Sequence, residues 1–231
     1  MPDILAIETS SEACSVAVFV GGEIRERHVH APLRHAELLL PAVSGLLDEA
    51  GRSLSSLDLI AFGRGPGSFT SLRIGIGVVQ GLAWGAGLPV VPVSSLAAVA
   101  QAAADQSTVA FSSVCVATDA RMDEVYTANF AREDSGQLVL SGTERVCAPA
   151  DVAAPAAGPF IAAGNGFERF EELIALAAGA ADRIADLQPR AETVCRLALE
   201  WLSRNEPLTA ALAQPVYIRN DVAEKPASQE S

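Results

Sequence analysis

The chain has 231 residues, of which half are hydrophobic, and its formal net charge is −12 at pH 7. This length is enough to bury a substantial core in one large domain or two small ones. The strong acidity disfavours direct binding to a polyphosphate backbone, so the composition argues against a nucleic-acid-binding protein. Four scattered cysteines without a C-x-x-C pair indicate reduced, buried thiols of a cytosolic protein.

The termini and the apolar stretches argue against export and against a membrane span. The N-terminal sequence MPDILAIETS lacks the basic region of a signal peptide. The apolar stretch 74–93 has the length of a membrane helix, but Pro89 and Pro92 interrupt it and glycines dilute it. We therefore expect a cytoplasmic protein with no membrane partner.

The first part of the chain predicts an α/β unit. DILAIETS is a near-continuous apolar run typical of a buried strand, and a hairpin turned at Gly21-Gly22 follows. RHAELLLPAVSGLLDEAG places apolar residues on one helical face and stops at Gly51. SLDLIAFGRGPG is a strand and loop, after which a second helix over 70–86 ends at Gly87. PVVPV is then a short strand before further helical sequence.

From about Ser113 the same order restarts. SSVCVATDAR is an apolar strand ending in an acid, EVYTANFARE and QLVLSGTERVC form a hairpin, and PFIAAGNGF is a short strand and turn before helical sequence. The repetition predicts a duplicated α/β fold with a mixed sheet in each half. We expect one half over residues 1–105, a second over 106–219 whose last segment is a candidate for returning to the first, and a flexible tail over 220–231.

The glycine-rich loop GRGPGS at residues 63–68 precedes a predicted helix, where backbone amides attract anions. It matches neither G-x-x-x-x-G-K-[ST] nor G-x-G-x-x-G, and the only lysine of the chain is Lys225. The alternatives are a phosphate cradle and a tight turn that needs glycine for its backbone conformation. The pattern favours the tight turn.

Three glycines recur every four residues inside the helix over 70–86, at Gly77, Gly81 and Gly85, and so share one face. Each interior glycine costs about 1 kcal/mol relative to alanine, so the stripe requires a compensating close approach. Two partners for it remain open at this point: the sheet of this same chain, or a helix of another protein.

Two acids end the corresponding strands of the two halves, Glu8 in AIETSS and Asp119 in TDARMDEV. In a cleft between the halves they are candidates to position a metal–nucleotide or a water, although strand-end acids are also common in turns. His28 and His30 alternate along a strand and His35 begins a helix. Because no cysteine or third histidine is near the alternating pair, a solvated edge strand is favoured over a metal site.

Several segments together resemble one family. They are, in chain order, ILAIETSSEACSVAV, GRGPGSFTSLRIGIGVVQGLAWG, VSSLAAVA, TDARMDEVYTA and PVYIRNDVAEK. These segments resemble the TsaB family of bacterial tRNA threonylcarbamoyladenosine biosynthesis proteins. The resemblance covers nearly the whole chain and is weakest between about 130 and 190. It implies the duplicated fold of actin, sugar kinases and heat-shock chaperones, abbreviated ASKHA.

The resemblance also implies a function. The family works with a catalytic paralogue, TsaD, and an ATPase, TsaE, and together they transfer threonylcarbamoyl to the adenosine beside the anticodon of tRNAs that read codons beginning with A. TsaD-type relatives bind the catalytic metal with an H-x-x-x-H pair, whereas the corresponding stretch 94–99 here has no histidine. The resemblance therefore implies a non-catalytic subunit without catalytic residues, metal ligands or a cofactor of its own.

The expected partners are TsaD, in a heterodimer, and TsaE, with tRNA bound only indirectly. A nucleotide at the TsaD interface and a homodimer of the isolated chain are left open. In the family the two long helices of the first half pack against the same helices of TsaD, and these correspond here to about 34–50 and 70–86. The expected partner-binding residues are His35, Leu39, Val43, Leu46, Arg73, Gly77, Gly81 and Gly85.

Two enzymes are the alternatives to a scaffold. The first is a small-molecule kinase of the same fold that uses Glu8 or Asp119 near metal-bound ATP. The second is a metallo-glycoprotease-like enzyme, against which the missing histidine pair argues.

Overall fold

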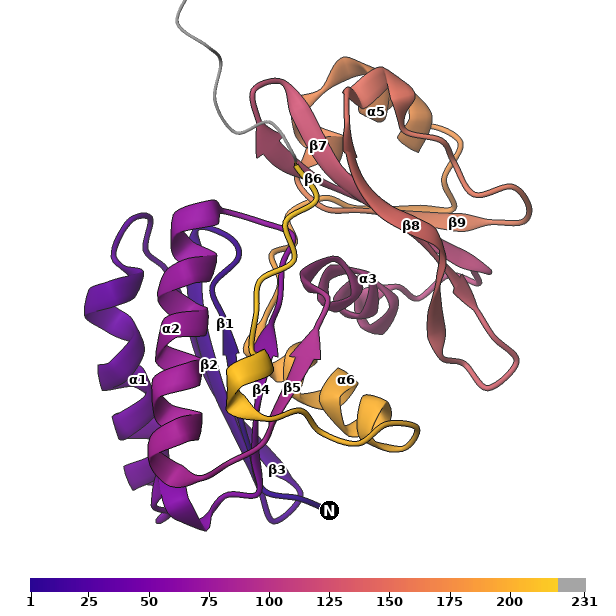
Figure 1. Ribbon diagram of the computed structural model, residues 1–231. Helices are drawn as coiled ribbons and strands as arrows, with labels where there is room; N and C mark the ends of the chain where they lie inside the picture. Colours follow the sequence, from indigo (N-terminus) through magenta and orange to yellow (C-terminus); the bar gives the residue numbers. More distant parts are fainter. Residues whose placement is uncertain (220–231) are drawn as a thin grey trace, which may run out of the picture.

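The computed structural model describes residues 1–219, and the tail expected over 220–231 lies outside them. Five strands form a first mixed sheet in the order β3-β2-β1-β4-β5 (Figure 1). β1 pairs antiparallel with β2 and parallel with β4. The strands are β1 (Ile4–Glu8), β2 (Ala13–Val20), β3 (Glu23–His30), β4 (Leu59–Gly63) and β5 (Val90–Val93).

A second five-stranded sheet has the order β8-β7-β6-β9-β10, which is the order of the first sheet repeated. β6 pairs antiparallel with β7 and parallel with β9, as β1 does with β2 and β4. Its strands are β6 (Ser113–Arg121), β7 (Glu124–Arg132), β8 (Leu138–Cys147), β9 (Phe160–Ala163) and β10 (Asp182–Ile184). The identical pairing confirms the predicted duplicated α/β fold with a mixed sheet in each half.

The central strands are buried on both faces, which is why they read as continuous apolar runs rather than alternating ones. On one face of the first sheet, Leu5 and Ile7 pack under α1 (His35–Glu49) and α2 (Phe69–Ala86). On the opposite face, Ile4 and Ala6 pack against α6 (Ala191–Leu202). The helices α1 and α2 therefore lie side by side on the outside of the first half (Figure 1).

The last helix of each half packs on the sheet of the other half. α3 (Ser95–Gln106) covers the second sheet, and α6 covers the first. The opposite face of the second sheet is covered by α4 (Gly166–Arg169) and α5 (Glu171–Ala177). The chain then returns to the first half, where Leu208 bridges to Val90 at the edge of β5. Three short 3-10 helices complete the fold: η1 (Leu54–Ser56), η2 (Pro149–Asp151) and η3 (Ala210–Leu212).

The helix α2 ends at Gly87, as its sequence predicts. Gly87 adopts a φ of 69°, in the left-handed region that glycine tolerates, and the amide of Leu88 closes the turn on the carbonyl oxygen of Ala83 at 2.9 Å. Among residues 1–219, none of the helices combines the length and apolar composition that crossing a membrane requires. The four cysteines are free thiols, three of them buried.

Candidate functional site

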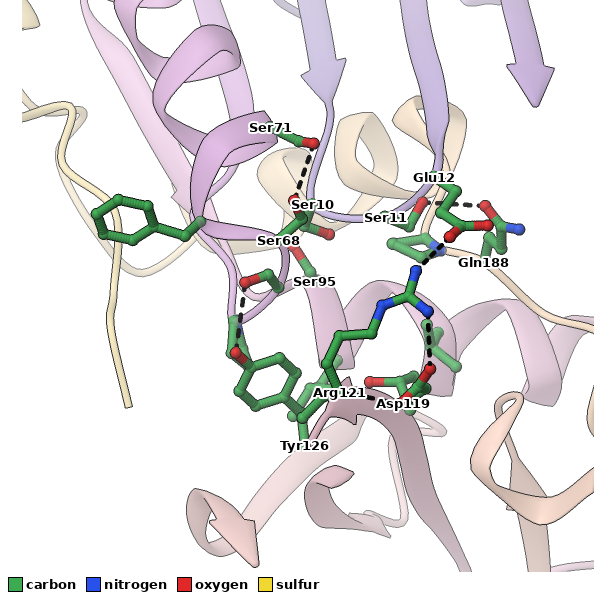
Figure 2. Close-up of a pocket in the computed structure, with 18 of the residues that line it drawn as sticks. Ser10, Ser11, Glu12, Ser68, Ser71, Ser95, Asp119, Arg121, Tyr126 and Gln188 are labelled. Carbon is green, nitrogen blue, oxygen red and sulfur yellow. Dashed lines mark hydrogen bonds and ion pairs between the residues drawn. The ribbon is translucent and has the colours of Figure 1, made fainter. Parts of the chain in front are cut away.

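A cleft of about 960 Å³ lies between the two halves. The first half contributes the β1–β2 connection and the first turns of α1, α2 and α3, and the second half contributes the β6–β7 turn. Hydroxyl, carboxylate and guanidinium groups meet there (Figure 2). The labelled side chains are Ser10, Ser11, Glu12, Ser68, Ser71, Ser95, Asp119, Arg121, Tyr126 and Gln188.

The glycine-rich loop before α2 packs closely on the β1–β2 connection. A Cβ atom at Gly63 would overlap the carboxylate of Glu8, and one at Gly67 would overlap the backbone of Ser10. The amide of Ser68 is already used, since it donates to the carbonyl oxygen of Ser10 at 2.8 Å. Close packing inside the chain explains Gly63 and Gly67, whereas Gly65, with a φ of 93°, has the backbone conformation that the tight-turn interpretation expects of glycine.

Glu8 is buried beneath the cleft. Its carboxylate accepts hydrogen bonds from the amide of Ser10 at 2.6 Å and from the hydroxyl of Ser95 at 2.8 Å. Burial raises the pKa of Glu8, and these hydrogen bonds offset only part of that rise. Glu8 therefore ties the β1–β2 connection to the start of α3, and its exposure is too small for it to bind a ligand in the cleft.

Asp119 is held by arginines on both sides. Arg169 donates to its carboxylate at 2.5 Å, and the amide of Arg121 donates to it at 2.8 Å. The guanidinium of Arg121 also crosses the cleft to the carboxylate of Glu12 on the β1–β2 connection (Figure 2). Both carboxylates are therefore paired with arginines of this chain.

The three histidines do not converge on one point. His35 is buried, and its Nε2 donates to the carbonyl oxygen of Ala13 at 3.1 Å. His28 and His30 lie on β3, an edge strand, as expected from their alternation. Within residues 1–219, no group of three or more histidine, cysteine, aspartate or glutamate side chains is arranged to hold a metal ion.

The glycine stripe of α2 faces away from this chain's own sheet. Gly77, Gly81 and Gly85 are exposed, and a Cβ atom at any of them would meet nothing within 4 Å. On the opposite side of the helix, by contrast, a Cβ atom at Gly75 would overlap the side chain of Thr9. Packing inside the chain therefore explains Gly75 but not the stripe. This excludes one of the two partners that the sequence left open for the stripe, the sheet of this same chain.

Four of the expected docking residues, His35, Leu39, Val43 and Leu46, are buried inside this chain. The three apolar ones belong to the core between α1, α2 and the first sheet. The apolar periodicity identifies the buried face of an amphipathic helix, and here that face is covered by the sheet of the same chain. We therefore correct the expectation: Leu39, Val43 and Leu46 are core residues, and His35 is buried beside the cleft.

Large exposed side chains that the sequence interpretation missed accompany the stripe. The side chain of Trp84 on α2 is 77% exposed, and that of Leu40 on α1 is 51% exposed. Arg73, which the sequence interpretation did include, is exposed as well, with its guanidinium 4.0 Å from the centre of the Phe69 ring. Their position opposite the buried helix face is the signal that could have identified them. We call this outer face the docking face, after the partner-binding role expected of it; its residues are Leu40, Phe69, Arg73, Gly77, Gly81, Trp84 and Gly85.

Comparison with known proteins gives consistent matches over most of the chain. Residues 29–226 match the model of the TsaD family, described as tRNA N6-adenosine threonylcarbamoyltransferase. A tRNA threonylcarbamoyladenosine biosynthesis protein TsaB from Escherichia coli (strain K12) is 38% identical over 226 residues, which cover 96% of each chain. A TsaB protein from Haemophilus influenzae is 36% identical over 96% of this chain and 95% of the relative.

A solved structure has the same fold over nearly the whole chain. YeaZ from Pseudomonas aeruginosa superposes with a TM-score of 0.87 at 43% identity, covering 94% of this chain and 100% of that one. A tRNA N6-adenosine threonylcarbamoyltransferase from Chlorobium luteolum is 32% identical, but over only 110 residues, or 41% of this chain and 32% of the relative.

Proposed function

This chain belongs to the TsaD family and, within it, to the TsaB proteins of tRNA threonylcarbamoyladenosine biosynthesis, and from that premise we propose that it is a non-catalytic scaffold subunit. It binds a TsaD-type catalytic subunit, activates it and recruits a TsaE-type ATPase in the cytoplasm. The complex transfers threonylcarbamoyl to the adenosine beside the anticodon of tRNAs that read codons beginning with A.

The observation that carries the docking proposal is the open glycine stripe of α2. Three interior glycines cost about 1 kcal/mol each relative to alanine, and nothing within this chain packs close enough to require them. A second helix backbone laid along Gly77, Gly81 and Gly85 supplies the missing reason, because only glycine permits so close an approach. The exposed Trp84 and Leu40 provide the apolar contact area beside it.

The cleft supports a scaffold rather than a kinase. A kinase needs free carboxylates to hold the metal ion of its nucleotide, and here arginines hold Asp119 and Glu12, while Glu8 is buried. The Arg121–Glu12 pair also joins the β1–β2 connection to the β6–β7 turn across the space between the halves (Figure 2). The charged side chains of the cleft thus form ion pairs with one another, which supports a structural role over binding of a substrate.

The charge of the chain supports indirect contact with tRNA. Its net charge of −12 repels phosphates, and the arginines Arg27, Arg64, Arg121, Arg169 and Arg190 are each engaged by a carboxylate of the same chain. We therefore assign tRNA binding mainly to the partner subunits.

Hydrogen exchange of a mixture with a TsaD-type protein tests the docking proposal. We expect a one-to-one complex in which the amides of α1 and α2 exchange more slowly, while those of α6 on the opposite face of the sheet do not change. Protection of α6 instead, or no complex at all, would contradict it. Sedimentation of the isolated chain shows whether it dimerises when the partner is absent, and hydrogen exchange of such a dimer shows whether α1 and α2 are the protected helices.

A further inference from the structure

The segment 213–219 runs from the first half of the molecule to the second. At its start, the Nε2 of Gln80 on α2 donates to the carbonyl oxygen of Ala213 at 2.7 Å. The amide of Val216 then donates to the carbonyl oxygen of Arg64, in the loop before α2, at 2.8 Å. We call this segment the strap, and its first part is fixed to α2 and to the loop that leads into it.

The middle of the strap contacts the docking face. The ring of Tyr217 packs on that of Phe69 with 5.2 Å between their centres, and the Nε of Arg73 donates to the Tyr217 hydroxyl at 3.0 Å. Arg73 and Gly77 are four residues apart on α2 and so lie on the same side of the helix. A partner helix laid along the glycine stripe therefore reaches the two side chains that hold Tyr217.

The end of the strap holds the β6–β7 turn of the second half. Arg219 is largely buried and donates to the carboxylate of Glu124 at 2.5 Å and to the carbonyl oxygen of Arg121 at 3.3 Å. That turn contains three successive non-glycine residues in the left-handed region, Arg121, Met122 and Asp123, with φ of 64°, 55° and 53°.

Arg121 pairs with Glu124, so Met122 and Asp123 form a two-residue hairpin loop, for which a positive φ at both central residues is the ordinary type I′ geometry. Arg121, the last residue of β6, is the additional non-glycine residue with a positive φ, a conformation that costs on the order of 1–3 kcal/mol. The contacts that hold this turn come from Arg219 of the strap, from Glu12 of the first half through the Arg121 side chain, and from Asp119, whose carboxylate accepts from the amide of Arg121. The turn lines the cleft, and one of the contacts that hold it comes from a segment anchored at the docking face.

We propose that the strap couples the docking face to the cleft: a protein seated on α2 displaces or clamps Tyr217 and thereby changes how Arg219 holds the β6–β7 turn. This inference rests on the proposed docking function for its biological role. The mechanical link itself is a property of the isolated chain and is testable without a partner.

The first experiment measures amide hydrogen exchange of residues 120–124 in the full isolated chain. Arg219→Gln removes the contact at the turn, and Tyr217→Ala removes the contact at α2. We expect both variants to raise exchange in the turn about tenfold, because each releases the same segment. Tyr217→Phe, which retains the ring and loses only the acceptor for Arg73, should give a smaller increase. Ile174→Ala, which truncates an exposed apolar side chain of α5, is the matched control and should change nothing in the turn.

Two results would overturn the inference. If Arg219→Gln accelerates exchange and Tyr217→Ala does not, the two ends of the strap are independent. If neither does, the turn does not depend on the strap. Unchanged exchange of β1 and of residues 113–118 of β6 in each variant serves as the check that the fold is intact. Tyr217→Phe replaces Tyr217→Ala in the comparison if the latter fails that check.

The second experiment adds a TsaD-type partner. Slower exchange along α2 reports docking, and altered exchange at residues 120–124 reports coupling. The inference predicts both changes in the wild type and only the α2 change in Tyr217→Ala. Protection of α2 with an unaltered turn in the wild type would refute the coupling. No protection of α2 would count against the docking function instead, while the result on the isolated chain would still stand.

Discussion

The substitution Gly81→Leu separates an intermolecular role of the glycine stripe from an internal one. Gly81 lies near the middle of α2, is exposed, and has open space where a Cβ atom would be. Leucine favours helix over glycine by about 0.8 kcal/mol, so the isolated variant should be slightly more stable than the wild type. For a chain of this size, that gain corresponds to a rise in Tm of roughly 2–3 °C.

The same substitution should weaken docking. Packed interfaces tolerate overfilling poorly, and extra side-chain volume at a close helix–helix contact costs about 1–3 kcal/mol. That penalty corresponds to a Kd for a TsaD-type partner that is weaker by a factor of about 5 to 150. Stability and affinity are thus expected to move in opposite directions, which a merely destabilised variant would not do.

Thermal melting of the isolated variant and calorimetric titration with the partner are the two assays. Glu200→Leu, on the exposed side of α6, is the control for adding an apolar side chain away from the docking face and should leave the affinity unchanged. Gly75→Leu is the contrasting glycine of the same helix and should destabilise the chain, because its side chain would overlap Thr9. Unfolding of Gly81→Leu, or a normal melt with unchanged affinity, would refute the reasoning.

Three further predictions follow from the cleft and the charge. The isolated chain should hydrolyse ATP no faster than buffer in the presence of magnesium, zinc or iron, because its cleft carboxylates are held by arginines. ATP hydrolysis that co-elutes with the protein in chromatography and disappears in Asp119→Ala would contradict this. A gel-shift assay at physiological salt should detect no saturable binding of tRNA by the isolated chain, and tight binding would reveal a basic patch. Burial raises the pKa of Glu8 above 4.5, which means that the folded state favours the neutral carboxyl. The resulting contribution to the free energy of unfolding is present below pH 4.5 and is lost as the pH rises through the folded-state pKa. Glu8→Gln is neutral at every pH, so urea unfolding should show its stability relative to the wild type increasing from pH 4.5 toward neutral, and a pH-independent difference would count against the assignment.

The elements with local signals were predictable from the sequence. β1 and β6 are continuous apolar runs, the end of α2 is marked by Gly87, and the restart near Ser113 predicts the duplication that the strand order confirms. The strand β10 was not identified, because it has only three residues and is defined by its pairing with β9. Local patterns do not report pairing of that kind.

The candidate site was predictable only in part, because its geometry depends on contacts between distant segments. The matching positions of Glu8 and Asp119 follow from the duplication, but their hydrogen-bond partners Ser95 and Arg169 are 87 and 50 residues away. For α1, periodicity separates an apolar face from a polar one without telling which molecule covers it, so core residues were predicted to dock. The strap has no apolar periodicity from which its position could be predicted. Contacts with α2, with the loop before α2 and with the β6–β7 turn fix that position instead.

Reconstituted transfer of threonylcarbamoyl to tRNA tests the central proposal most directly. The assay combines a TsaD-type subunit, a TsaE-type ATPase and tRNA, and measures modified adenosine with and without this chain. The scaffold function predicts that modification requires this chain, persists when its cleft acid is replaced in Asp119→Ala, and falls in Gly81→Leu in proportion to lost binding. Full modification without the chain, or loss of modification in Asp119→Ala while the complex still forms, would contradict a non-catalytic scaffold.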